Sequence, residues 1–148
     1  MSNKRKIGQV KKLFISIKDE KQRSESQNIL VDRQGIVKDK FYNTNNDRSI
    51  LLTSQHAYEL MQEKNIEASY GQLGENILVD FNPYDLEEGT QLSIGNVIIE
   101  ITIECTICDF LTKINNKVPK LLKKDRGVFA KVLNGGSINI NDTIHIIN

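Results

Sequence analysis

A β-branched segment that follows a tight-turn dipeptide is the feature that most constrains the fold of this chain. Residues 97–103 read Val-Ile-Ile-Glu-Ile-Thr-Ile, and Gly95-Asn96 separates them from residues 91–94. β-branched side chains favour strands, and glycine and asparagine both tolerate the positive φ angles of a two-residue turn. The sequence therefore predicts an antiparallel hairpin in which residues 97–103 form a central strand.

Short segments with strand or helix patterns recur along the rest of the chain. Alternation of apolar and polar residues predicts strands at Val10–Ile17, Asn76–Phe81, Val128–Leu133 and Thr143–Ile147, with shorter candidates at residues 29–31 and 49–52. Helices are predicted from Thr53 or Ser54 to about Asn65, at residues 110–114, and at Lys120–Lys124 after Pro119. Closure into a barrel leaves few free strand edges. We therefore expect a mostly β (α+β) fold: a closed or nearly closed β-barrel with two or three short helices.

Length and charge limit the class of protein. The chain has 148 residues, about two-fifths of them apolar, and a formal net charge of +1. We expect one domain over residues 1–148, with residues 1–7 as a flexible N-terminus. The near-neutral charge gives no support for nucleic-acid binding. No apolar run approaches the ~20 residues that span a bilayer, and the N-terminus lacks the apolar stretch of a secretory signal, so we expect a cytoplasmic protein without membrane contact.

Cys108 has the clearest potential for chemistry. It is predicted to lie where a strand passes into a helix, and a lysine-rich segment follows it as far as Lys131. Nearby cations or a helix N-terminus lower the pKa of a thiol, and the thiolate can bind a soft metal or carry a sulfur atom. The alternative is an inert cysteine that packs in the core.

Cys105 and Cys108 together form a Cys-x-x-Cys motif, which adds further alternatives. A zinc site would need two more ligands, and neither His56 nor His145 stands at ligand spacing. A dithiol redox pair is expected in a βαβ unit rather than in a barrel. A structural disulfide is not expected in a reducing cytoplasm. We interpret Cys105 as a packing residue and leave the dithiol alternative open.

The second half of the chain resembles the MOSC domain family. The resemblance rests on Gly74-Glu75-Asn76, Ile94-Gly95-Asn96, Glu100-x-Thr102, a cysteine eight residues after Glu100, and residues 127–133 with the pattern Gly-x-Phe-Ala-Lys-Val-Leu. MOSC domains are similar to the C-terminal part of eukaryotic molybdenum-cofactor sulfurase and also occur as small stand-alone bacterial proteins. The resemblance extends from about Gly8 to Ile146 and is strongest after residue 71.

The resemblance implies a mostly β, barrel-like fold that binds the molybdenum cofactor (molybdopterin) or handles sulfur at one cysteine. Counted from Glu100, that cysteine is Cys108, which would be the catalytic thiolate and the ligand of molybdenum. Asp39 and Arg48 fall in a region that resembles the family's Gly-Asp-x-His-like motif. Lys38 stands where glycine is usual and Phe41 where histidine often stands.

Six cofactor-binding residues follow from the resemblance: Arg48, Glu75, Asn76, Arg126, Lys131 and Asp39. The cations would hold the anionic tail of the cofactor, and Glu75-Asn76 would form a polar lip over the pocket. Structural alternatives are that Asn76 bonds within its own turn and that Arg48 ends a strand in solvent. We interpret Lys120, Lys123 and Lys124 as a solvated helix face.

Four functional hypotheses result. The two enzymatic ones are sulfur transfer through a transient persulfide on Cys108 and molybdenum-dependent reduction, which needs a separate electron donor because the chain has no room for a reductase domain. The other two are a non-catalytic carrier or chaperone for the cofactor and a dithiol oxidoreductase that uses Cys105 and Cys108. The expected partners are the small-molecule pterin and a sulfur-donor or electron-donor protein.

Overall fold

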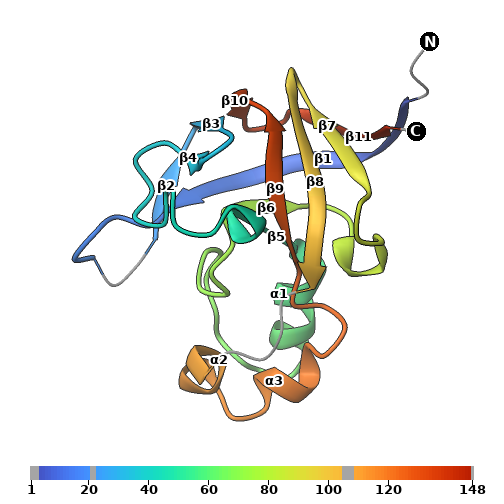
Figure 1. Ribbon diagram of the computed structural model, residues 1–148. Coiled ribbons are helices and arrows are strands. Elements are labelled where there is room, and N and C mark those ends of the chain that lie inside the picture. Colours follow the sequence, from blue (N-terminus) through green and yellow to red (C-terminus); the bar gives the residue numbers. More distant parts are fainter. Residues whose placement is uncertain (1–3, 21–22, 105–108, 148) are drawn as a thin grey trace.

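Strands of the computed structural model close into a barrel (Figure 1). The structure describes residues 4–20, 23–104 and 109–147. Within these ranges the seven barrel strands are β1 (Lys4–Ile15), β5 (Ile50–Ser54), β6 (Ile77–Val79), β7 (Gln91–Ile94), β8 (Val97–Glu104), β9 (Val128–Asn134) and β11 (Thr143–Ile147). Their order is β11-β7-β8-β9-β5-β6-β1, and β1 pairs again with β11. The predicted closed, mostly β barrel is therefore confirmed.

The predicted hairpin forms part of the barrel wall. Ile94 pairs with Val97 across the turn, where Gly95 has a φ of +60°. β8 alternates buried and half-buried residues over its first six positions. It pairs with β7 on one side and with β9 on the other, so its central position is confirmed.

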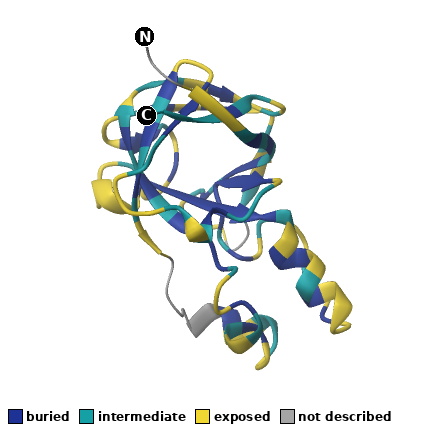
Figure 2. Ribbon diagram, turned by 90° about the vertical axis from the view of Figure 1, so that its right-hand side faces the viewer, coloured by how far each residue is buried: buried dark blue, intermediate teal, exposed yellow. Residues whose placement is uncertain are grey.

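The inward-facing side chains of the barrel strands form one apolar core. Val10, Leu52, Ile77, Ile99 and Ile144 are among its fully buried members. Figure 2 shows the buried residues concentrated along the barrel strands and the exposed residues on loops and helix surfaces. Successive strand residues face opposite sides of a sheet, which is why alternating sequences fill a barrel. Full burial of each large aliphatic side chain contributes about 1.5–3 kcal/mol.

The first strand begins earlier than the sequence suggested. Lys4 pairs with Ile147 of β11, and the pairing continues to Gln9 opposite Thr143. Residues 4–7 are thus part of β1 and pair with the last strand, whereas residues 1–3 lie outside the described residues.

The remaining described strands lie outside the barrel. β2 (Ser24–Ser26) pairs with the far end of β1. β3 (Asn28–Asp32), β4 (Gly35–Ile36) and β10 (Gly136–Asn139) form a separate sheet with the order β10-β3-β4.

The described helices gather at one end of the barrel (Figure 1). They are α1 (Gln55–Glu63), α2 (Asp109–Ile114) and α3 (Val118–Leu121), and they share a second apolar cluster that includes Met61, Leu111 and Leu122. Ser54 caps α1 as predicted, since its hydroxyl accepts a hydrogen bond from the His56 N–H at 2.9 Å. Pro119 lies in the first turn of α3 as expected, but the helix spans Val118–Leu121 and so lies earlier than the predicted Lys120–Lys124.

Two 3₁₀ turns complete the described elements: η1 (Asn46–Arg48) and η2 (Pro83–Asp85). In the ranges that the structure describes, no helix has the length and apolar character needed to span a membrane.

Candidate functional site

A pocket of about 260 Å³ lies between the loop after β4, the η1 turn and the strands β5 and β9. Its lining is Arg23, Asp39, Phe41, Thr44, Asn45, Arg48, Ser49, Leu51, Gly74, Asn76 and Phe129. Three of the predicted cofactor-binding residues, Asp39, Arg48 and Asn76, therefore meet around one pocket. Phe41, Leu51 and Phe129 give it apolar walls.

Asp39 is a buried acid at the base of the loop after β4. Its side chain is 6% exposed, and Oδ1 accepts a hydrogen bond from the Ser16 N–H at 2.6 Å. Oδ2 accepts another from the Phe41 N–H at 3.0 Å. Asp39 thus ties this loop to the end of β1, and a charge-assisted pair of this kind holds a loop firmly.

The backbone conformation at Lys38, just before Asp39, explains why glycine is usual at this position in the family. Its φ of +74° lies in the left-handed region, which favours glycine because a Cβ atom is strained there. The lysine keeps the backbone conformation although it lacks the freedom of glycine.

Arg48 comes from η1 and reaches the mouth of the pocket. Its Cζ lies 5.3 Å from the centroid of the Phe129 ring, within the range of a cation–π contact. The Asn45 side chain accepts the N–H of Asp47 at 3.1 Å and so starts the turn that presents Arg48. The Arg48 residue is exposed, so its guanidinium is available to a ligand.

Asn76 bridges two strands at the wall of the pocket. Its Oδ1 accepts the Leu51 N–H at 3.0 Å, and its Nδ2 donates to the Phe14 carbonyl at 3.3 Å. The backbone of Asn76 also bonds to both residues. The amide therefore holds β5 and β1 together where β6 begins, rather than bonding within its own turn.

Glu75 does not line this pocket. It is 0% exposed, and the Tyr58 hydroxyl lies 2.7 Å from its Oε2 and donates to the carboxylate. The Gly71 N–H donates to the same oxygen at 3.0 Å. Burial raises the pKa of the Glu75 carboxyl, and the hydrogen bond from Tyr58 opposes that shift. In the structure, the Glu75 carboxylate therefore holds the loop before β6 and does not form a polar lip over the pocket.

Lys131 lies in β9, as predicted, and its Nζ is 3.2 Å from Oε2 of Glu100 on β8. It lines a second, open groove of about 730 Å³ that also contains Glu88, Thr102 and Arg48. Arg48 is thus shared by the pocket and the groove, whereas Lys131 belongs to the groove.

Arg126 lies outside both cavities described above. It is 8% exposed, and its Nη2 donates to the Pro119 carbonyl at 2.8 Å. The Thr53 hydroxyl donates to the Arg126 carbonyl at 3.2 Å. Arg126 thus connects β5 to the α3 turn and is placed to support the helices.

Comparison with known families decides the affiliation of the chain. Residues 39–145 match the MOSC domain family. The chain belongs to the MOSC family. No match was found among curated proteins.

The MOSC fold is also found in solved structures similar to this one. The crystal structure of the YuaD protein from Bacillus subtilis is 15% identical, has a TM-score of 0.85, and the match covers 100% of this chain and 99% of that chain. YiiM from Geobacillus stearothermophilus is 14% identical with a TM-score of 0.69, and the match covers 99% and 76%. YiiM from Escherichia coli is 13% identical with a TM-score of 0.68, and the match covers 96% and 70%. At these identities the likeness shows the fold alone.

The MOSC-like run from Gly127 to Leu133 has a packing explanation. Gly127 has a φ of +105°, and a Cβ atom there would lie 2.1 Å from the Leu52 carbonyl oxygen. A glycine is therefore needed for β9 to enter the barrel beside β5, where Leu52 pairs with Val128.

Arg23 is a pocket residue that the sequence analysis missed. It precedes β2 in a polar stretch of the sequence, and no periodic pattern distinguishes it there. Its Nη1 is buried and has no hydrogen-bond partner among the described residues. Burial lowers the pKa of the Arg23 guanidinium, and Asp39 and Glu75 oppose that shift.

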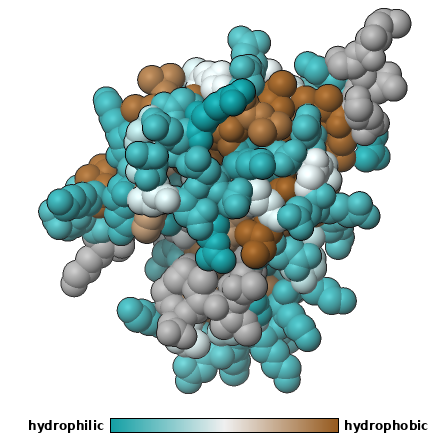
Figure 3. All heavy atoms as spheres, viewed as in Figure 1, coloured by the Kyte–Doolittle hydropathy of each residue, from teal (hydrophilic) through white to brown (hydrophobic). Residues whose placement is uncertain are grey.

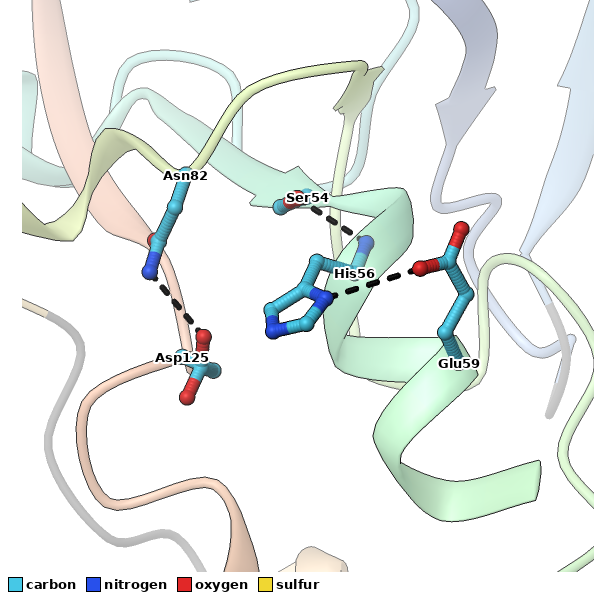
Figure 4. Close-up of polar contacts among 5 residues, drawn as sticks. All are labelled: Ser54, His56, Glu59, Asn82 and Asp125. Atoms are coloured by element: carbon cyan, nitrogen blue, oxygen red, sulfur yellow. Dashed lines mark hydrogen bonds and ion pairs between the residues drawn. The ribbon is translucent and has the colours of Figure 1, made fainter. Parts of the chain in front are cut away.

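His56, in the first turn of α1, is exposed. Its Nδ1 lies 3.5 Å from Oε2 of Glu59, and both side chains are more than half exposed. Figure 4 shows this pair near a separate hydrogen bond of 3.0 Å between Asn82 and Asp125. Among the described residues, no cluster of His, Cys, Asp and Glu could hold a metal ion.

The remaining predictions concern lysines and cysteines. Lys120, Lys123 and Lys124 are exposed as predicted, although only Lys120 lies in a helix and the other two follow the end of α3. Figure 3 shows hydrophilic residues at the end where α2 and α3 lie. Cys105 and Cys108 lie outside the described residues, so their predicted roles stay predictions.

Proposed function

We propose that this MOSC protein binds a molybdenum-cofactor-type pterin in the 260 Å³ pocket and acts in the cytoplasm. Family membership is consistent with a role related to the molybdenum cofactor. The observation that carries the proposal is convergence: Asp39, Arg48, Asn76 and Phe129 come from four separate segments and line one pocket.

The chemistry of the lining fits such a group. Pterin cofactors combine a flat, hydrogen-bonding ring with an anionic tail, and ligand sites usually pair apolar walls with a few polar groups. Phe129 and Leu51 supply apolar wall, and Arg48 supplies an exposed cation fixed by an aromatic ring. Lys131 and Arg126 are less suited to hold the tail, because Lys131 pairs with Glu100 and Arg126 bonds to the α3 turn.

Cys108 is the proposed thiolate. It precedes α2 directly in the sequence, and Ile103 near the end of β8 pairs with the pocket residue Phe129. When bound, molybdenum would supply a redox centre for two-electron reduction. In the sulfur-transfer alternative, the thiolate itself would carry the sulfur atom. Both chemistries require one ionised thiol within reach of the bound ligand.

Cofactor content tests the proposal. The full chain, purified gently from cells that make molybdenum cofactor, should contain pterin and molybdenum, or an extra sulfur atom on Cys108. Native mass spectrometry and metal analysis would measure them. Cys108→Ser should lower the content at least tenfold, whereas Cys105→Ser, the matched control, should retain it.

Equal losses in the two variants, or wild-type protein without pterin and without extra sulfur, would contradict the proposal. Turnover separates the enzyme from the carrier. Loaded protein that retains cofactor but does not reduce an N-hydroxylated substrate with an electron donor would favour the carrier or chaperone.

A further inference from the structure

Arg23 enters the pocket from a part of the chain outside the region that matches the MOSC family, which begins at residue 39. The pairing of β2 with β1 fixes this position, since Ser24 lies opposite Ile15. Ser16, the next residue of that chain segment, donates its N–H to Asp39. Arg23 and Asp39 are therefore held at the same end of β1.

The Arg23 guanidinium has a hydrogen-bond donor, Nη1, that no described residue accepts. Its Nη1 is buried without an acceptor, and a buried donor without a partner is unfavourable. Two carboxylates lie near enough to act on its charge, Asp39 and Glu75.

Both of these carboxylates accept hydrogen bonds from other donors, and neither is bonded to Nη1. Asp39 accepts hydrogen bonds from the N–H groups of Ser16 and Phe41. Glu75 accepts from the Tyr58 hydroxyl and the Gly71 N–H. They stabilise the charge of Arg23 without supplying an acceptor for Nη1. An arginine so placed has its charge compensated and one side of its donor fork unused.

We propose that Arg23 and Arg48 form an oxyanion subsite in the pocket, which takes a phosphate or carboxylate group of the ligand. The proposal deepens the proposed function, on which it rests for the choice of pocket. Among the described lining residues the two arginines are cationic and Asp39 alone is acidic. Arginine presents planar, paired donors that match the oxygens of these groups, and apolar walls strengthen such bonds.

Binding of inorganic phosphate to the full chain without cofactor tests the subsite. Isothermal calorimetry at fixed ionic strength should detect binding by the wild type, and Arg23→Met should weaken it at least tenfold. Arg33→Met is the matched control, because Arg33 is an exposed arginine in the turn between β3 and β4. It should bind phosphate as the wild type does. Arg23→Lys, which keeps the charge but loses the fork, should fall between them.

A second measurement uses only the wild-type protein, so it does not depend on whether a variant folds. In the wild type, phosphate should shift the side-chain NMR signals of Arg23 and leave those of Arg33 in place. Acetate, tested in the same way, identifies the source: a clear preference for phosphate indicates a phosphate ester, and equal binding indicates a ligand carboxylate.

Phosphate binding that survives Arg23→Met, or a wild type that does not bind phosphate, would overturn the subsite. The failure of the proposed function has a different signature. A protein that never contains pterin, molybdenum or extra sulfur, yet binds phosphate through Arg23, would retain the subsite and lose the cofactor assignment.

Discussion

Glu75 and Asn76 are neighbours in the sequence with different roles in the structure. The Glu75 side chain is fully buried against Tyr58, while Asn76 lines the pocket and bridges β1 and β5. The two side chains have different partners on either side of the chain just before β6, Tyr58 for Glu75 and Leu51 with Phe14 for Asn76. One residue therefore supports the loop from behind while the next faces the site.

The buried Glu75 carboxyl makes stability depend on pH. Its pKa in the folded protein is raised by burial above the ordinary value of 4.5. Between the pKa of the unfolded chain and the higher pKa of the folded protein, the folded protein keeps a proton that the unfolded chain has released. The stabilisation from this proton is fully present below pH 4.5 and is lost as pH rises through the folded pKa. Each unit of difference corresponds to about 1.4 kcal/mol. Glu75→Gln should remove this part of the pH dependence, as measured by urea unfolding across the window.

Glu63→Gln is the matched control for this prediction, because Glu63 is an exposed acid at the end of α1. It should keep the pH dependence of the wild type. If Glu75→Gln lost stability with rising pH as steeply as the wild type, the carboxyl would not be the group responsible.

The sequence indicated part of the site at this scale. Asp39, Arg48 and Asn76 were predicted and meet at the pocket. Arg23 could not be predicted, because its place depends on the pairing of β2 with β1 and its own segment shows no pattern. The Tyr58–Glu75 contact, 17 residues apart, likewise depends on how α1 packs.

The junction of β5 and β9 shows how one glycine positions an element. Gly127 itself lies close to the Leu52 carbonyl, and Val128, the first residue of β9, then pairs with Leu52. Phe129 follows on the pocket wall, so the entry of β9 determines where this ring lies.

Gly127→Ala should reduce the unfolding free energy by about 3 kcal/mol, since it adds a backbone clash to an unfavourable φ. Gly89→Ala separates the two effects. Gly89 has a φ of +91°, but a Cβ atom added there would meet nothing within 4 Å. This change should cost about 1 kcal/mol. Chemical denaturation would measure both, and equal losses would show that the clash is relieved by movement of β9.

Elements with a strong pattern were predictable, and elements made by pairing were not. The hairpin at Gly95-Asn96 and the helix after Ser54 carry local signals of turn, alternation and cap. β2 reads Ser-Glu-Ser, which has no strand character of its own. It is a strand because β1 extends past the barrel and offers backbone groups to it.

On the scale of the whole molecule, β6 connects two apolar cores. Ile77 and Val79 belong to the barrel core, whereas Leu78 between them packs with the helices. The helical core is completed by short elements such as α3, which has four residues. Short helices depend on packing, so the helical end should open more readily than the barrel.

Hydrogen exchange of the native protein would measure this difference. Amides of α2 and α3 should exchange by local opening, before those of β8 and β9. Leu122→Ala should cost about 2–5 kcal/mol and speed exchange mainly in the helices. Ile99→Ala, the matched change in the barrel core, should speed exchange throughout. If Leu122→Ala accelerated β8 and β9 equally, the two cores would form one cooperative unit.

The pairing of β5 with β6 is parallel, while the other described barrel pairs are antiparallel. Because the two strands run in the same direction, the chain must leave the barrel after Ser54, cross its end and return to the starting level before Ile77. Extra residues in this excursion would leave every strand register intact. An insertion in this excursion would therefore add surface over one end of the barrel without altering the paired strands.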